Sequence, residues 1–302
     1  SEPVAAMEYV PDHQALAVAA GRTIRVWNLG ARSSSPQVLE GHKDLITCVA
    51  LSPREPLLFT GSLDRTIRKW DLTTGKSKGL LEGFDGVALS LAFHPNGSAL
   101  AIALEGGRVV IVDPVTGNLI RELPKHEQPV LVVRYSPDGN ILATAGGTED
   151  LTQPGLVKLW DAETGHEKAT LEGHRYTIKA LAFSPDGTTL ALGDSPPGGS
   201  KGGRIYRWNV PSLKQLPYKY VRDGVRALAY SPDGATLAAT LQSGDLYVYG
   251  MIDNEIPTMS FLNAHASAAP GLAFGPHGET LATGGKDGTV KLWTLSSVSI
   301  SP

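Results

Sequence analysis

A repeat that runs through the whole chain is the feature that most restricts how these 302 residues can fold. The phrase Ser-Pro-Asp-Gly marks it at 136–139, 184–187 and 231–234, and looser versions begin at positions 10, 52, 94 and 275. Each phrase follows one short apolar run and precedes two more. The last run of each unit contains a bulky apolar residue, and these residues are Trp27, Trp70, Val112, Trp160, Trp208, Tyr249 and Trp293. Successive members are 41 to 48 residues apart, so the chain holds seven units in an uninterrupted array.

Each unit is expected to form a small sheet. Its apolar residues alternate with polar ones, and Pro-Asp-Gly or Asp-Gly turns separate the runs, which predicts a meander of short antiparallel strands. One such sheet buries little apolar surface alone, so neighbouring units must stack to form a core. Four strands in a period of this length are typical of a β-propeller. We therefore expect one domain over residues 1–302, with units at approximately 1–42, 43–84, 85–126, 127–174, 175–221, 222–265 and 266–302.

The composition suits a chain rich in turns and narrows the possible partners. Its 34 glycines and 21 prolines follow no collagen-like period and indicate many tight turns. A formal net charge of -3 gives no support for a nucleic-acid or membrane-surface partner. The single cysteine, Cys48, cannot form an intrachain disulfide and, with the lack of a recognisable signal sequence, slightly favours a cytoplasmic protein. We expect a monomer.

Short motifs within the units connect the chain to a known family. Glu-Gly-His occurs at 40–42 and 172–174, and Trp-Asp occurs at 70–71 and 160–161. On these residues the chain resembles the WD-repeat (WD40) β-propellers over essentially its full length. The resemblance implies an all-β fold, a seven-bladed β-propeller of four-stranded antiparallel blades.

The resemblance also implies a hydrogen-bonded set of His, Ser or Thr, Asp and Trp in each complete blade. Two blades match it fully, with His42, Thr60, Asp64 and Trp70 in the second and His265, Thr283, Asp287 and Trp293 in the seventh. His126 and His174 keep the same offset in blades 4 and 5, but neither blade has the matching Asp, and blade 5 has Gly193 in place of Thr. Phe84 and Val221 replace the His in blades 3 and 6.

A catalytic triad or a metal site is the alternative interpretation of these polar residues. They recur once per blade at separate places around a ring, so no common metal ion could reach them. We therefore expect a structural role, in which the set satisfies buried polar groups and holds the strands together. No catalytic residue, metal ligand or cofactor is predicted.

The ends of the sequence suggest how the ring closes. The first apolar run, at 4–10, reads as the inner strand of blade 1, and the only candidate for the outer strand of blade 7 is the segment 296–302. We expect blades 1 and 7 to meet without a strand shared between them.

Enlarged turns point to one face as the candidate binding surface. In the family's geometry, the loops before each inner strand and the turns between second and third strands share a face called the top. Two of these turns are long, at 146–155 and 194–203, and insertions in repeat proteins often map to the binding face. The candidate partner-binding residues are Glu149, Asp150 and Lys201 in these turns, with Lys43, Arg175, Tyr176, Arg222 and Lys286 elsewhere on the top. Ordinary solvated surface is the alternative for each of them.

Two charges interrupt an otherwise neutral position of the inner strands. The residue before the last aromatic or leucine of the strand is Ala in five units, but Glu8 and Arg134 in blades 1 and 4. A charge there must face a channel, water or a partner, because an unpaired buried charge is costly. We expect both to line the central channel, with a local salt bridge as the alternative.

These observations favour a non-catalytic scaffold that binds a protein or peptide on the top face. Two alternatives remain. The propeller could be a sensory or regulatory domain of a larger multidomain protein, or a hydrolase with a metal on the ring axis. The hydrolase would need several His, Asp or Glu residues on the inner strands, where the chain mostly has Ala.

Overall fold

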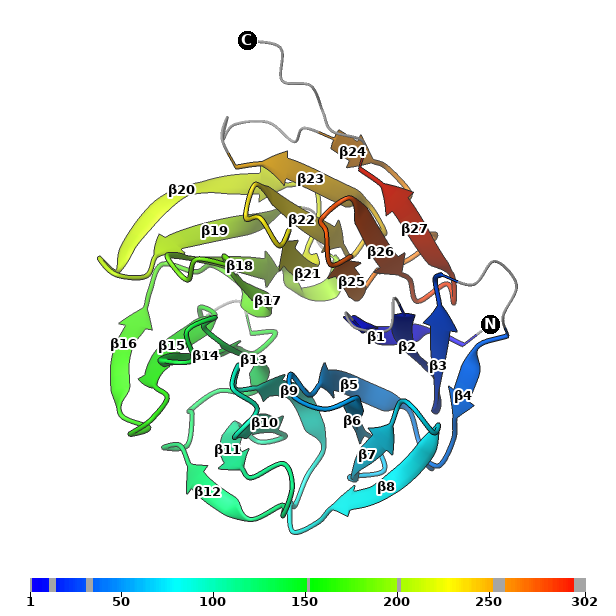
Figure 1. Ribbon diagram of the computed structural model, residues 1–302. Helices are drawn as coiled ribbons and strands as arrows, with labels where there is room; N and C mark the ends of the chain where they lie inside the picture. The colour runs from blue at the N-terminus through cyan, green and yellow to red at the C-terminus, as the bar shows by residue number, and fades with distance from the viewer. Residues whose placement is uncertain are drawn as a thin grey trace.

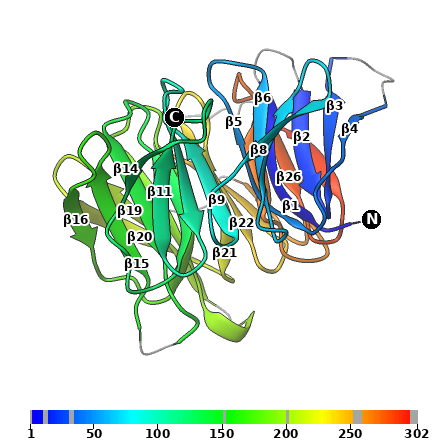
Figure 2. The same cartoon turned by 90° about the horizontal axis from the view of Figure 1, so that it is seen from below.

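Seven antiparallel sheets surround a central axis in the computed structural model, which describes residues 2–10, 15–30, 35–150, 153–199, 202–251 and 259–295 (Figure 1). The predicted seven-bladed β-propeller is therefore confirmed. Seen from the side, the strands of each blade run between the two faces of the ring (Figure 2). Within the described ranges the remaining regular element is a short 3-10 turn at Pro197–Gly199, and no helix there is long and apolar enough to cross a membrane.

The strands follow the chain order, from the axis outward in every blade. Blade 1 contains β1 (Val4–Val10), β2 (Ala15–Ala20), β3 (Thr23–Asn28) and β4 (Gln37–Leu39). Blade 2 contains β5 (Ile46–Leu51), β6 (Leu57–Ser62), β7 (Ile67–Asp71) and β8 (Lys76–Leu81). Blade 3 contains β9 (Ala88–Phe93), β10 (Leu100–Leu104), β11 (Arg108–Val112) and β12 (Leu119–Glu122). Blade 4 contains β13 (Val130–Tyr135), β14 (Ile141–Gly146), β15 (Leu156–Asp161) and β16 (Glu167–Leu171).

The last three blades include the longest described strand, the outer strand of blade 5. Blade 5 contains β17 (Thr177–Phe183), β18 (Thr189–Ser195), β19 (Gly203–Asn209) and β20 (Lys214–Val221). Blade 6 contains β21 (Val225–Tyr230), β22 (Thr236–Leu241), β23 (Leu246–Gly250) and β24 (Met259–Phe261). The described part of blade 7 contains β25 (Gly271–Phe274), β26 (Thr280–Gly284) and β27 (Val290–Thr294). The outer strand predicted at 296–302 lies outside the described residues.

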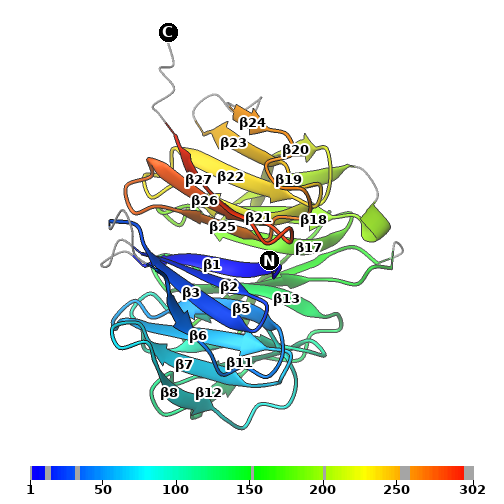
Figure 3. The same ribbon diagram turned by 90° about the vertical axis from the view of Figure 1, so that its right-hand side faces the viewer.

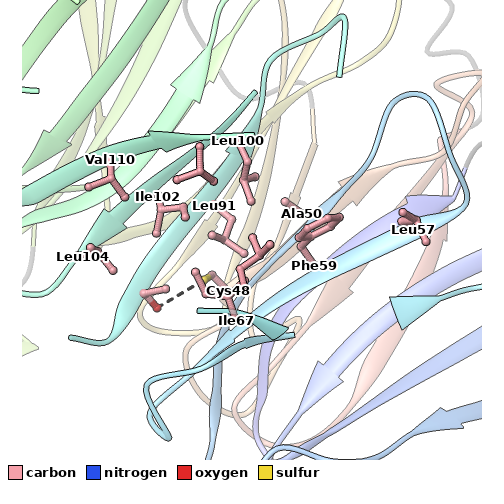
Figure 4. Packing of buried hydrophobic residues seen from close by; sticks show 13 residues of the cluster. Cys48, Ala50, Leu57, Phe59, Ile67, Leu91, Leu100, Ile102, Leu104 and Val110 are labelled. Carbon is pink, nitrogen blue, oxygen red and sulfur yellow. Dashed lines mark hydrogen bonds between the residues drawn. The ribbon is translucent and has the colours of Figure 1, made fainter. Parts of the chain in front are cut away.

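The core consists of apolar layers between neighbouring blades. Successive side chains of a strand point to opposite faces of its sheet, so each blade packs against both neighbours. In β6, Phe59 lies in a buried cluster with Leu91 and Leu100 of blade 3 (Figure 4). The next side chain, Leu58, packs toward blade 1. Cys48 is buried in the same layer as Phe59, and its thiol donates to the Ala88 carbonyl at 3.5 Å. Because side chains alternate between the two faces of each sheet, every blade contributes apolar residues to the layers on both sides of it. These layers, or seams, hold the ring together.

The Ser-Pro-Asp-Gly phrase forms the turn between the first two strands of a blade. In blade 4 the Ser136 hydroxyl donates to Asp138 Oδ1 at 2.5 Å and accepts from the Ile141 N–H at 2.9 Å. Gly139 adopts a φ of 78°, a conformation that glycine reaches without steric cost, and its N–H donates to the Ser136 carbonyl. The same Ser–Asp bond recurs in blades 5 and 6, so the repeated phrase encodes one repeated turn.

The ring closes where β1 lies beside β25 of blade 7 and β5 of blade 2 (Figure 3). The Val4 N–H donates to the Gly285 carbonyl at 3.1 Å, and the Tyr9 hydroxyl lies 3.4 Å from Thr280 Oγ1. Met7 is buried in a cluster with Val4 and Ala282. Apolar packing and a few hydrogen bonds therefore join blade 1 to blade 7.

Candidate functional site

A single hydroxyl joins two rings in blade 2. Thr60 Oγ1 lies 2.7 Å from His42 Nε2 and accepts a hydrogen bond from Trp70 Nε1 at 2.8 Å. The other ring nitrogen of His42 lies 2.9 Å from Asp64 Oδ2, which also accepts from the Lys43 N–H. Burial disfavours the ionised carboxylate of Asp64, but hydrogen bonds from Thr66, Lys43 and His42 outweigh it and hold its pKa below the ordinary value. The four residues form one continuous network.

Blades 7 and 4 contain versions of this arrangement. In blade 7, His265 Nε2 lies 2.7 Å from Thr283 Oγ1, and Trp293 Nε1 donates to the same hydroxyl at 2.9 Å. His265 Nδ1 lies 2.9 Å from Thr289 Oγ1 and 3.4 Å from Asp287 Oδ1. In blade 4, His126 and Trp160 both bond to Thr144, at 2.9 and 2.8 Å. Across the described ranges, no three His, Cys, Asp or Glu side chains are placed to share a metal ion.

Blade 5 has a different network, which the spacing of residues in the sequence did not predict. His174 packs against the ring of Tyr206, with centroids 5.0 Å apart. Asp194 at the end of β18 is completely buried, and it accepts hydrogen bonds from the Arg204 N–H at 2.6 Å and the Tyr206 hydroxyl at 3.2 Å. Burial raises the pKa of Asp194 to about 6. The spacing predicts no Asp in this blade at the offset seen in blades 2 and 7; Asp194 instead directly follows Gly193 on β18, at the start of the enlarged turn.

An arginine and three tyrosines form a cluster beside Asp194 on blade 5, which we call the Arg204 cluster (Arg204, Tyr206, Tyr218 and Tyr220). The Arg204 guanidinium lies over the rings of Tyr218 and Tyr220, at 5.1 and 5.3 Å from their centroids. It also donates to the Tyr206 hydroxyl at 3.2 Å. Tyr218 and Tyr220 are 40% and 69% exposed, and their hydroxyls lie 3.0 Å apart. Blade 5 therefore presents aromatic rings and a guanidinium in a fixed arrangement.

Two of the predicted residues, Arg175 and Tyr176, lie next to this cluster, and a third, Arg222, lies beyond the end of β20. The Arg175 N–H donates to the Tyr206 hydroxyl at 3.2 Å, and the Arg175 guanidinium lies 5.2 Å from the centroid of the Tyr176 ring. Arg222 follows β20, is exposed, and lies 3.9 Å from the buried Asp245 carboxylate. These contacts place the predicted arginines around blades 5 and 6.

The remaining predicted residues spread over three other blades. Glu149, in the enlarged turn of blade 4, lies 3.6 Å from Lys179 of β17. The N–H of Asp150 in the same turn donates to Thr148 Oγ1 at 3.3 Å. Lys43 on blade 2 and Lys286 on blade 7 are exposed. Lys201 lies outside the described residues. The structure therefore groups the candidates of blades 4 to 7 and leaves Lys43 apart.

A cavity of about 610 Å³ is lined by the inner strands of all seven blades. Glu8 and Arg134 both lie on its wall. Burial raises the pKa of the Glu8 carboxyl, and the positive charge of Arg134 opposes this shift. Arg134 also donates to the Val133 carbonyl at 2.8 Å and to Ser90 Oγ at 3.4 Å. Two further charged residues of the wall, Lys179 and Arg226, were not predicted.

Comparison with protein-family models follows the same repeats. The model described as WD domain, G-beta repeat matches residues 33–71, 117–161, 165–209 and 257–294, together more than half of the chain. The chain belongs to the WD-repeat family. A second model, the anaphase-promoting complex subunit 4 WD40 domain, matches residues 81–136 of this WD-repeat propeller.

Curated relatives match about two fifths of the WD-repeat propeller. Protein groucho of Drosophila melanogaster is 32% identical over 123 residues, which are 41% of this chain and 16% of that protein. Echinoderm microtubule-associated protein-like 3 of Homo sapiens is 33% identical over 115 residues, 37% of this chain and 12% of that protein. The 77 kDa echinoderm microtubule-associated protein of Strongylocentrotus purpuratus is 32% identical over 120 residues, 39% of this chain and 17% of that protein. The chain thus covers less than a fifth of each relative's length.

Proposed function

We propose that this WD-repeat propeller is a non-catalytic scaffold that binds a protein or peptide through the top face of blades 4 to 7. The observation that carries the proposal is the Arg204 cluster, in which exposed tyrosines and an arginine are held in mutual contact. Tyr and Arg are enriched among the residues that dominate binding energy at protein interfaces.

The arrangement of the cluster supports a binding role in two ways. Its tyrosines stand on the outer strand β20, where they are exposed and still rest on Arg204. Side chains fixed before binding lose little conformational freedom when a partner arrives, so their contacts contribute more fully to affinity. Asp194 and Tyr206 hold Arg204 from below through backbone and side-chain hydrogen bonds. The blade 5 turn leads directly into Arg204, and the Thr148 carbonyl of the blade 4 turn accepts a hydrogen bond from Thr177 of β17, so both turns could offer further contact area at blade 5.

A capture experiment with three baits tests the proposal. The wild-type propeller, a Tyr218→Ala/Tyr220→Ala variant and a Leu119→Ala/Ile120→Ala variant are each immobilised and exposed to native lysate. Leu119 and Ile120 are equally exposed apolar residues of an outer strand, β12 of blade 3, and serve as the matched control. We expect a partner that is retained by the wild type and the control and lost from the tyrosine variant, since an interface anchor is worth about 2 kcal/mol or more.

Equal retention of every captured protein by all three baits would contradict the placement of the site on blade 5. Thermal melting of each bait verifies that the substitutions leave the fold intact. A fourth bait, in which the two turns are shortened to Asp-Gly turns within 147–154 and 196–202 so that Asp194 and Gly203 are kept, measures the contribution of the enlarged turns.

An alternative is that binding serves a larger multidomain protein, in which the propeller is the sensory or regulatory part. The small share of each relative that the chain covers favours it. The size of the native gene product on a denaturing gel, measured with an antibody to the propeller, distinguishes the two.

A further inference from the structure

Two cations stand side by side at one level of the central cavity. Lys179 of β17 and Arg226 of β21 each lie four residues before the aromatic residue that ends the inner strand, on neighbouring blades. The other five blades have uncharged residues at this level: Ala5, Thr47, Leu89, Leu131 and Pro270. At this level of the cavity the positive charge is therefore confined to one side of the wall.

Burial disfavours the charged form of each of the two cations, and two carboxylates oppose it: Glu149 favours the charged form of both, and Asp223 favours that of Arg226. Burial lowers the pKa of Lys179, the charges of Arg226 and Lys286 lower it further, and Glu149 raises it. Arg226 is half-buried and its Nε donates to Gln242 Oε1. Among the described residues, no carboxylate oxygen lies within 4 Å of its guanidinium. Placing like charges together in a partly desolvated site is unfavourable unless an anion joins them.

The chain's own Glu149 already places a carboxylate at this site. Its oxygen lies 3.6 Å from Lys179 Nζ, beyond the length of a good hydrogen bond. The Glu149 side chain is 72% exposed and belongs to the enlarged turn of blade 4, whereas Lys179 is only 19% exposed. An ion pair as exposed as this one contributes little free energy, so another carboxylate could displace it at small cost.

We propose that Lys179 and Arg226 bind a carboxylate side chain from an acidic segment of the partner, which takes the place of Glu149. The proposal rests on the top-face binding function proposed above and names the chemistry that one part of that face recognises. Lys and Arg together match a carboxylate in charge and in hydrogen-bond donors. Lys286, on blade 7, adds a third positive charge that acts on Lys179, and the net charge of -3 of the whole chain shows that this local positive charge is not a general property of the surface.

Binding of a fluorescein-labelled hexaglutamate peptide, followed by fluorescence anisotropy at low ionic strength, tests the proposal. Lys179→Gln and Arg226→Gln each remove one donor and are expected to weaken binding about fivefold to tenfold, as losses of close charge pairs at interfaces do. Glu149→Gln removes the internal competitor and is expected to tighten binding about threefold. Lys214→Gln, at the exposed opposite end of β20, makes the same change in net charge and is expected to leave the affinity unchanged within about a factor of two.

The opposite responses at Glu149 and Lys179 separate a binding site from a merely structural ion pair, since a structural pair would lose stability from either change. A Glu149→Gln variant that binds the peptide more weakly overturns the proposal, as does equal binding by the Lys179, Arg226 and Lys214 variants. Absence of binding to hexaglutamate at millimolar concentration also overturns it, including the case in which a phosphoserine peptide binds instead.

The capture experiment distinguishes failure of this inference from failure of the proposed function. A partner that is lost from the Tyr218→Ala/Tyr220→Ala bait but retained by Lys179→Gln and Arg226→Gln baits leaves the top-face function intact and removes the carboxylate site from it. Loss from the Lys179→Gln and Arg226→Gln baits, with retention by the Lys214→Gln bait, supports both.

Discussion

At the scale of single residues, the small side chain of Thr60 joins two buried rings of blade 2. Its hydroxyl oxygen bonds to the rings of His42 and Trp70, which come from different segments of blade 2 and are both buried. A buried polar group that loses its partner costs far more than the net value of the bond it formed. One hydroxyl therefore satisfies two ring nitrogens that water cannot reach.

Thr60→Val is expected to lower the free energy of unfolding by about 3 kcal/mol, since it leaves two ring nitrogens without a partner. Thr240→Val in blade 6 is the matched control, because the Thr240 hydroxyl is equally buried but, within the described part of the chain, bonds only to the Ala269 carbonyl. The control is expected to cost about 1 kcal/mol. Urea denaturation of the two variants measures the difference, and equal losses would show that Thr60 does not link the two rings energetically.

Sequence alone found the residues of blades 2 and 7 because their spacing repeats, and His42, Thr60 and Trp70 meet as that spacing implied. It did not find Asp194, whose role depends on the enlarged turn that follows it. A longer turn changes which residue reaches the base of the hairpin, and sequence spacing does not contain that geometry. The same limit hid Tyr218 and Tyr220, since outer strands carry no recurring motif.

At the scale of elements, the hairpin of β18 and β19 depends on a carboxylate in an unusual state. Asp194 accepts the Arg204 N–H across the base of the enlarged turn, and burial raises its pKa to about 6. The ordinary pKa of an Asp in an unfolded chain is about 3.9. The folded state therefore disfavours the ionised form, and this penalty is present above pH 6 and absent below about pH 4.

Asp194→Asn removes this titration. The stability of the wild type relative to the variant is expected to rise by about 2 kcal/mol as the pH falls from 7 to 4, because the folded wild type takes up a proton there before the unfolded chain does. Unfolding free energies from urea titrations at both pH values give the change. Asp186→Asn in the same blade is the control with opposite sign, since the Ser184 and Thr188 hydrogen bonds lower the pKa of Asp186. A gap between wild type and Asp194→Asn that does not vary with pH would contradict the assignment.

The strands themselves were predictable, because the apolar runs recur in all seven units and the Ser-Pro-Asp-Gly turn recurs in three of them, with looser versions in the other four. The two cations of the cavity wall, Lys179 and Arg226, were not predictable. Glu8 and Arg134 stood out because Ala occupies their position in the other five blades. Lys179 and Arg226 occupy a position where no residue type recurs in more than two blades, so no common residue makes them stand out as exceptions.

At the scale of the whole molecule, one seam differs from the other six. Blades 1 and 7 lie at opposite ends of the blade order, so no described connection leads from one into the other, and Met7 packs between them. Leu91 occupies the same position of its inner strand in blade 3, at a seam where the chain runs directly from β8 to β9. The two seams have similar packing and different connectivity.

Met7→Ala and Leu91→Ala are both expected to lower the free energy of unfolding by about 2 to 4 kcal/mol, the usual range for truncating a large buried side chain. Hydrogen exchange should separate them. Met7→Ala is expected to speed exchange in β1 and in β25 to β27 before global unfolding, because local opening needs no connected segment to unravel. Leu91→Ala is expected to raise exchange only with the global transition. Identical exchange maps for the two variants would show that the closing seam is no weaker than the rest.

The buried position of Cys48 offers a practical advantage for following binding in solution. Burial raises the pKa of its thiol to about 11, and only the thiolate reacts readily with electrophiles. The chain has no other cysteine. An Arg175→Cys variant would therefore take up a maleimide dye at one chosen point on the top face while the native thiol stays unmodified. Fluorescence from that single dye would report the arrival of a partner directly.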